Sequence, residues 1–295
     1  MASATAIAPS AVDQRAKAQE AVRKITTIAT LPEVTAKIIA TVEDPKSTAS
    51  QLHRIVSHDP ALVTRILKVV NSSFYGLPGQ IGSIERAIVL LGLNAVKNIA
   101  VAASLGQLFR GAKLCEGFTA KDLWTHCIAV AVAAREMARQ MKAPIADEAF
   151  LAGMIHDIGI LVSLQLWPEQ LREVCDIARR DGRSFREVEQ EKFGLDHQQL
   201  GQALAEMWKF PRPCQLVAGY HHEPATLGDD NRLLVSLVYT ADVICCKSTK
   251  HGFNLTALHQ GLDGGGAGEA IDPAIAAKVA ENLDTLVGGA TSLLG

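Results

Sequence analysis

The stretch Leu151–Ile160 constrains this chain more than any other, because it places an adjacent histidine and aspartate inside an apolar segment. The segment reads LAGMIHDIGI, and its apolar residues recur with helical periodicity. A charged side chain in such surroundings needs a charged partner or a metal ion, since burying it alone is costly. The fold must therefore bring further polar groups to His156 and Asp157.

The other periodic segments also indicate helices. Thr119 to Asp122 has the pattern of a capping box, and Asp59 before Pro60 is typical of a helix start. This cap explains the dipeptide His58-Asp59 without a metal. A single helix is expected from about Asp147 to Leu166. No convincing strand pattern and no internal repeat is found, so the sequence predicts an all-α fold.

Composition excludes several classes of protein. The 29 basic and 31 acidic residues give a net charge of −2, which argues against a broad nucleic-acid footprint. Six scattered cysteines without a CxxC pair suit a reducing compartment. The Ala-rich start lacks the basic residues of a signal peptide, and polar residues interrupt the apolar window 88–105. We therefore expect a cytoplasmic protein that binds neither nucleic acid nor membrane.

Two pairs of candidate metal ligands lie on predicted helices. Asp122 and His126 are four residues apart and share a helix face, but a capping Asp beside an ordinary helical His is the favoured explanation of this pair alone. His156 and Asp157 point about 100° apart on a helix. Both can reach one ion if the helix loosens or ends there, which Gly159 permits. The alternative is a buried His bonded to backbone with Asp157 paired elsewhere.

Further imidazoles and carboxylates follow on later segments. His197 can be a plain first-turn residue, and His221-His222 a surface pair at a helix end. Asp242 is a stronger candidate ligand, because it lies in an apolar segment with no basic residue to pair with until Lys247. Each signal is weak alone. Together they favour a divalent metal site, because neutral imidazoles and carboxylates are the usual ligands of such ions.

Several motifs together resemble the HDOD domain, the HD-related output domain of bacterial signalling proteins. The resemblance covers about residues 25–225, with Asp242 in a trailing helix. It is carried by the segments Asp59–Leu62, Asn71–Gly76, Ile84–Gly92, Phe150–Leu161, Phe193–His197, Trp208–Pro211 and His221-His222. It implies an N-terminal helical subdomain beside an HD-like helical bundle.

This resemblance gives the expected division of the chain. We expect a disordered N-terminus at residues 1–11 and the N-terminal helical subdomain at 12–110. The HD-like helical bundle is expected at 111–250, followed by a C-terminal helical extension at 251–295.

The resemblance also implies a ligand set. HD proteins place their metal ligands in the order His, His-Asp, Asp, and the related HD-GYP phosphodiesterases add a carboxylate before the first His, a later His and a His-His pair. The matching residues here are Asp122, His126, His156, Asp157, His197, His221, His222 and Asp242. One or two divalent ions of iron, manganese or zinc are implied.

Two departures from the HD-GYP pattern bear on catalysis. The lysine that those enzymes carry after the His-Asp pair is Ile160 here, so a cation that could hold a substrate phosphate is missing. Pro224–Leu227 replaces their signature after His-His-Glu. Both changes put hydrolysis in doubt without removing a ligand.

The residues and the resemblance together leave three candidate functions. The first is a signalling module that acts through protein partners and keeps the pocket for a metal or a nucleotide ligand, with no strong catalysis. The second is a metal-dependent phosphodiesterase for a nucleotide or cyclic dinucleotide, in which Asp157 would be catalytic as the carboxylate between the metal ions. The third, nucleic-acid binding, is disfavoured by the charge balance.

Overall fold

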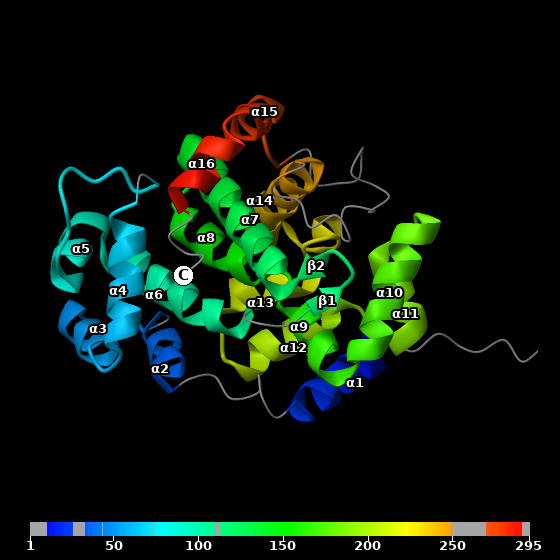
Figure 1. Ribbon diagram of the computed structural model, residues 1–295. Helices are drawn as coiled ribbons and strands as arrows, with labels where there is room; N and C mark the ends of the chain where they lie inside the picture. Colours follow the sequence, from blue (N-terminus) through cyan, green and yellow to red (C-terminus); the bar gives the residue numbers. More distant parts are fainter. Residues whose placement is uncertain are drawn as a thin grey trace, which may run out of the picture.

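The computed structural model describes residues 11–25, 33–42, 44–72, 74–109, 113–248, 250 and 270–290. These residues form helices and one two-stranded ribbon, so the all-α prediction is confirmed (Figure 1). The expected disorder at 1–11 lies outside the described residues, except for Ala11, where the first helix begins.

A first group of helices precedes residue 110. It consists of α2 (Glu33–Val42), α3 (Ala49–Val56), α4 (Pro60–Val70), α5 (Ile84–Leu91), α6 (Leu93–Leu105) and the 3-10 turn η1 (Gly106–Phe109). Helices α2, α4 and α5 pack against α6, and α6 in turn packs against α8 of the second group. Asp59 caps α4 as expected, its carboxylate accepting from the backbone N–H of Leu62 at 2.9 Å.

The second group is a bundle. Its helices are α7 (Ala120–Gln140), α8 (Ala146–Ile155), α9 (Ile158–Leu166), α12 (His197–Met207), α13 (Arg212–Tyr220) and α14 (Asp229–Lys247). The long helix α7 packs along α8 and α14, while α12 packs against both α9 and α13. The bundle surrounds a continuous apolar core that also reaches the first group.

Smaller elements cover the bundle. They are α10 (Pro168–Asp181), α11 (Phe185–Phe193), η2 (Pro224–Thr226), α15 (Pro273–Glu281), α16 (Leu283–Ala290) and the ribbon of β1 (Lys113–Cys115) with β2 (Phe118–Thr119). Helices α15 and α16 lie on α7. The sequence shows no strand pattern here, because strands of two or three residues are too short to show alternation. Gly117 turns it with a φ of 82°.

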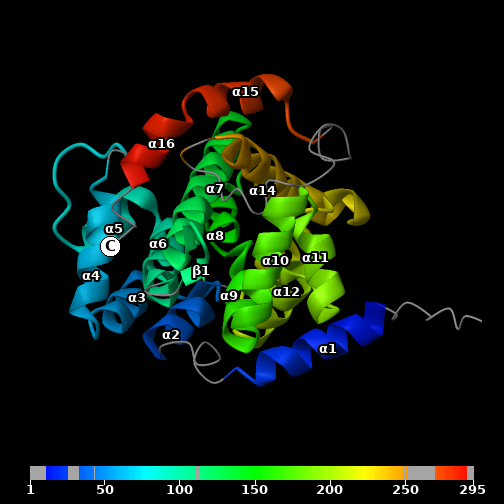
Figure 2. The ribbon, with the colours of Figure 1, turned by 45° about the vertical axis from the view of Figure 1, so that its right-hand side comes forward.

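Helix α1 (Ala11–Arg23) packs against α12 of the bundle. Arg15 pairs with Glu206 at 3.0 Å, and Gln14 accepts a hydrogen bond from Gln199. Figure 2 shows α1 in blue along the lower edge of the molecule, below α12. The expected N-terminal subdomain, residues 12–110, includes this helix. The division of the chain into subdomains stays a prediction.

The helix expected over 147–166 is interrupted at the His-Asp pair. Helix α8 ends at Ile155 and α9 begins at Ile158, so His156 and Asp157 form the junction between them. The backbone ψ of Asp157 is 16°, outside helical values. Periodicity does not reveal this break, because the residues on both sides are equally apolar.

The whole segment Ala146–Leu166 is long and apolar enough to cross a membrane. Yet 83% of its most apolar window is buried inside the fold, as in the core of a water-soluble bundle. Its hydrophobicity is therefore accounted for by contacts with α7, α12 and α13.

Gly159 sets the distance between α9 and α12. A Cβ atom added there would overlap the carbonyl oxygen of His197 and lie 2.7 Å from the backbone nitrogen of Gly201. The two helices thus approach backbone to backbone, which only glycine allows. Because Asp157 precedes α9 and His197 begins α12, this contact also sets the distance between two candidate ligands.

We predict that Gly159→Ala destabilises the protein by about 1–3 kcal/mol or more, because the two helix backbones must separate. Urea unfolding measures this difference. Gly82→Ala is the control, since a Cβ there meets nothing within 4 Å. Equal stability of the two variants would contradict the close contact.

Candidate metal centre

Five segments of the bundle bring the predicted ligands to one point. Helix α7 contributes one His, the α8–α9 junction the His-Asp pair, α12 its first residue, the end of α13 two adjacent His, and α14 one Asp. These residues are His126, His156, Asp157, His197, His221, His222 and Asp242. All are buried except His222, which is partly exposed.

Asp157 occupies the middle of this cluster. Its Oδ1 lies 3.4 Å from His221 Nε2 and 3.6 Å from His197 Nε2. Its Oδ2 lies 3.2 Å from His156 Nε2 and 3.8 Å from His126 Nε2. Each carboxylate oxygen therefore faces a different pair of imidazoles, and one aspartate serves two groups of candidate ligands.

Asp242 extends the cluster on the side of His126. Its Oδ1 lies 3.1 Å from His126 Nε2, and its Oδ2 lies 3.9 Å from His222 Nδ1. Burial raises the pKa of this carboxyl, but His126 more than compensates, so the pKa stays below its ordinary value. Asp242 is therefore ionised and available to a cation.

The polar atoms of the cluster fit a divalent cation better than they fit one another. His156 Nε2, His221 Nε2 and both oxygens of Asp157 are buried and make no hydrogen bond to any described residue. Leaving such a group unsatisfied costs about 1–3 kcal/mol. A donor set of neutral imidazole and carboxylate is what zinc, iron or manganese accepts. The residues present thus suit the metal that the sequence predicts.

Hydrogen bonds at the opposite ring nitrogens orient three imidazoles. His156 Nδ1 lies 2.8 Å from the carbonyl oxygen of Gly153, and His221 Nδ1 lies 3.0 Å from that of Val217. A carbonyl can only accept, so both Nδ1 atoms carry the proton. In the neutral rings, the Nε2 atoms, which face Asp157, therefore have a lone pair for a metal.

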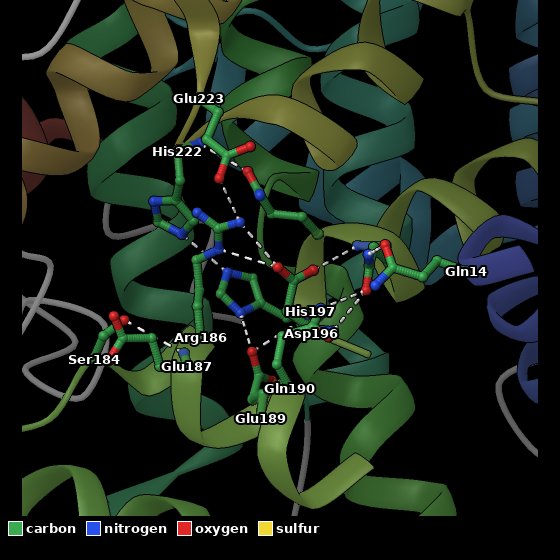
Figure 3. Close-up of polar contacts among 12 residues, drawn as sticks. Gln14, Ser184, Arg186, Glu187, Glu189, Gln190, Asp196, His197, His222 and Glu223 are labelled. Carbon is green, nitrogen blue, oxygen red and sulfur yellow. Dashed lines mark hydrogen bonds and ion pairs between the residues drawn. The ribbon is translucent and has the colours of Figure 1, made fainter. Parts of the chain in front are cut away.

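Glu189 orients the third imidazole, and sequence reasoning missed it. Its Oε2 lies 2.6 Å from His197 Nδ1 and accepts the backbone N–H of His197 at 3.0 Å (Figure 3). Glu189 is fully buried on α11. Its spacing is a signal that could have found it, because Glu189 lies four residues after Phe185 and four before Phe193 on the buried face of α11. The exposed Glu187 and Glu191 lie off that face.

Arg186 ties together the two segments that carry His197 and His222. Its guanidinium pairs with Asp196 at 3.0 Å and with Glu223 at 2.8 Å (Figure 3). These acids directly precede His197 and directly follow His222. Arg186, Asp196 and Glu223 also line a cavity of about 530 Å³ between α1 and the bundle. Arg186 therefore has a structural role at the edge of the metal cluster.

Asp122 does not join the cluster. It is exposed at the start of α7, where its carboxylate accepts from the backbone N–H of Thr119 at 2.8 Å in the expected capping box. Asp122 is thus the capping residue that the alternative explanation of its spacing from His126 described. This position does not support its assignment as a metal ligand. Ile160, which replaces the lysine of HD-GYP enzymes, is buried.

The electrostatics of the cluster favour protonated imidazoles in the absence of metal. Burial lowers the pKa of His197, but Glu189 outweighs burial and raises it. Burial disfavours the charged imidazole of His156, but the adjacent Asp157 outweighs burial and holds the pKa of His156 well above 6.5. Burial also acts on Asp157, and the attraction of His156, with help from His221 and His197, keeps the pKa of that carboxyl well below its ordinary value. A metal must therefore displace the proton of His156.

We predict that Glu189→Gln weakens metal binding by about 10–100-fold, because His197 loses its carboxylate partner. Competition with a chromophoric chelator measures the affinity. The control is Glu191→Gln. Glu191 lies on the same helix as Glu189 but is exposed and pairs with Arg183. Unchanged affinity in Glu189→Gln would show that His197 does not take part in binding.

Metal binding should also release at least one proton at neutral pH, because the pKa values of His156 and His197 are both raised. Below the raised pKa of His156, protons compete with the metal, so affinity falls about tenfold or more for each unit of decreasing pH. Above that pKa, this contribution levels off. Calorimetry in two buffers of different ionisation enthalpy counts the protons, and an identical heat in both at pH 7 would contradict the prediction.

Comparison with known proteins agrees with this architecture. A solved HDOD domain protein of unknown function from Geobacter sulfurreducens superposes with a TM-score of 0.77 at 19% identity, covering 96% of this chain and 99% of that one. A chain from Shewanella amazonensis SB2B, named as a candidate phosphohydrolase, gives a TM-score of 0.72 at 24% identity over 95% and 97% of the two chains. At these identities the likeness shows the fold.

Sequence comparison identifies the family. An uncharacterized protein of Treponema pallidum (strain Nichols) is 26% identical over 222 residues, which span 75% of this chain but only 42% of that protein. The HDOD domain family matches residues 28–224, more than half of the chain and close to the range of the resemblance. The chain belongs to the HDOD domain family.

Proposed function

We propose that this protein is a regulatory HDOD module whose buried His/Asp cluster holds a divalent metal, and that it acts through protein contacts without strong catalysis. The observation that supports this most is that seven of the eight predicted ligands converge and are almost entirely buried. His156, His197 and His221 have no exposed surface, and Asp157 is 1% exposed. A cluster closed in this way suits a structural or sensory ion better than a substrate.

Two groups of side chains would hold metal. His126, His156 and Asp157 form one group, and Asp157 with His197, His221 and His222 forms the other. Such an ion, whether iron, manganese or zinc, supplies Lewis acidity and draws its ligands together. The chain's own contribution is to hold five helical segments around it, so the presence of metal would change how firmly these segments pack.

A second candidate is a phosphodiesterase acting on a nucleotide or cyclic dinucleotide, with Asp157 as the catalytic carboxylate. The retained ligands favour it, and so does the name given to the Shewanella protein. Two observations oppose it. The apolar, buried Ile160 offers no charge to a phosphate, and the cluster lacks the exposure that a dinucleotide requires.

The proposed setting is bacterial signalling in the cytoplasm, with a protein partner. A chain from Marinobacter aquaeolei VT8 that is named as a candidate signal transduction protein shares the fold, with a TM-score of 0.69 at 24% identity over 96% of this chain and 64% of that one. The six cysteines are buried and form no disulfide among the described residues, as expected in a reducing compartment. The charge balance supports a partner other than nucleic acid.

The purified protein should contain iron, manganese or zinc in near-stoichiometric amount, measured by elemental mass spectrometry. His156→Ala/Asp157→Ala should lose it, because both groups of ligands share Asp157. His58→Ala alters an exposed residue of the other His-Asp pair and should keep the metal. Metal-loaded protein should unfold at a higher temperature than the apoprotein. A free metal concentration a hundred times Kd should raise the free energy of unfolding by about 2.7 kcal/mol.

A nucleotide panel separates the two candidate functions. The regulatory module should show no turnover of cyclic or linear nucleotides when loaded with manganese or iron. Turnover that Asp157→Ala abolishes would establish the phosphodiesterase instead. Absence of metal after reconstitution of folded protein would contradict both functions and leave the cluster as a relic of the fold.

A further inference from the structure

A thiol lies at the edge of the metal cluster, and the HD ligand pattern does not include it. Cys246 follows Asp242 by four residues on α14, so both side chains lie on one face of that helix. Its Sγ donates to Asp242 Oδ1 at 3.2 Å, and this same oxygen lies 3.1 Å from His126 Nε2. The three side chains thus converge from α7 and α14.

We propose that Cys246 is a metal ligand, so that His126, Asp242 and Cys246 form a mixed nitrogen, oxygen and sulfur site. This inference rests on the proposed function, in which the cluster holds metal. Sγ, Nε2 and one carboxylate oxygen all lie within 4.8 Å of one another. All three residues are buried, with exposures of 1% for His126, 2% for Asp242 and 8% for Cys246.

The spacing of the donor atoms fits one tetrahedral ion. Zinc bonds of about 2.3 Å to sulfur and about 2.0–2.1 Å to nitrogen or oxygen place neighbouring ligand atoms roughly 3.3–3.6 Å apart. The two separations from Asp242 Oδ1, 3.1 Å and 3.2 Å, are only slightly shorter. The third separation, from Sγ to His126 Nε2, is at most 4.8 Å, so an ion would adjust all three by movement of the donor side chains.

The thiol makes the two ends of the cluster chemically different. Around His197, His221 and His222 the described donors are imidazole nitrogens and the carboxylate of Asp157. At the end near His126, a thiolate is added. Thiolate ligands favour zinc, cobalt and ferrous iron over manganese and magnesium. The inference is therefore that the Cys246 end selects a borderline-soft ion, while the other end is a nitrogen-rich site.

Cobalt titration of the reduced full-length protein tests this. Bound Co²⁺ shows visible ligand-field bands with any tetrahedral donor set, and a near-ultraviolet charge-transfer band only with a thiolate. The wild-type protein should show both. Cys246→Ser should keep the visible bands and lose the charge-transfer band. Cys245→Ser, which changes the neighbouring buried cysteine, should keep both.

Selectivity gives a second readout. Cys246→Ser should weaken zinc binding by about tenfold or more, because loss of even a residue that only supports a ligand has an effect of this size. The same substitution should change manganese binding much less. A mutation-free measurement protects against a misfolded variant: X-ray absorption of the zinc-loaded wild type should show a sulfur neighbour at about 2.3 Å.

The outcomes separate this inference from the proposed function. A charge-transfer band that persists in Cys246→Ser, or a zinc spectrum without sulfur, overturns the ligand assignment and leaves Cys246 as a hydrogen-bond donor to Asp242. Visible bands present in that case still support a metal in the cluster. A wild-type protein that binds neither cobalt nor zinc overturns both.

Discussion

The buried charge of Asp157 is the constraint on which the rest of the structure depends. A carboxylate with 1% exposure and no hydrogen bond within the described residues is costly unless cations or polarised groups surround it. Four imidazoles lie within 4 Å of its oxygens. They come from α7, the α8–α9 junction, α12 and the end of α13. The packing of these segments therefore also brings together the groups that neutralise the charge of Asp157.

Backbone geometry makes this arrangement reachable. The interruption between α8 and α9 lets His156 and Asp157 turn to the same point, which a continuous helix would not allow for adjacent residues. The close approach at Gly159 then brings α12, and with it His197, to the carboxylate. A second layer of contacts completes it: Glu189 orients His197, and Arg186 joins Asp196 to Glu223.

The same burial that protects the cluster shapes what it can do. Water and a large substrate have little access to atoms that lie inside the bundle, whereas a single ion needs no more room than its ligands enclose. An ion that bound the folded state alone would stabilise it, so metal binding, helix packing and stability would be coupled. Under the proposed function, this coupling is the physical route from the buried cluster to a protein partner.

The sequence by itself determined the helical class, the caps at Asp59 and Thr119, and the ligand residue types, because these depend on local periodicity and on the cost of an isolated buried charge. The tertiary structure alone decided which residues meet. It kept Asp122 away from the cluster, brought Glu189 of α11 to His197 of α12, and brought His126 of α7 to Asp242 of α14. The distances between helices decide such contacts, and those distances are fixed by packing between segments far apart in the chain.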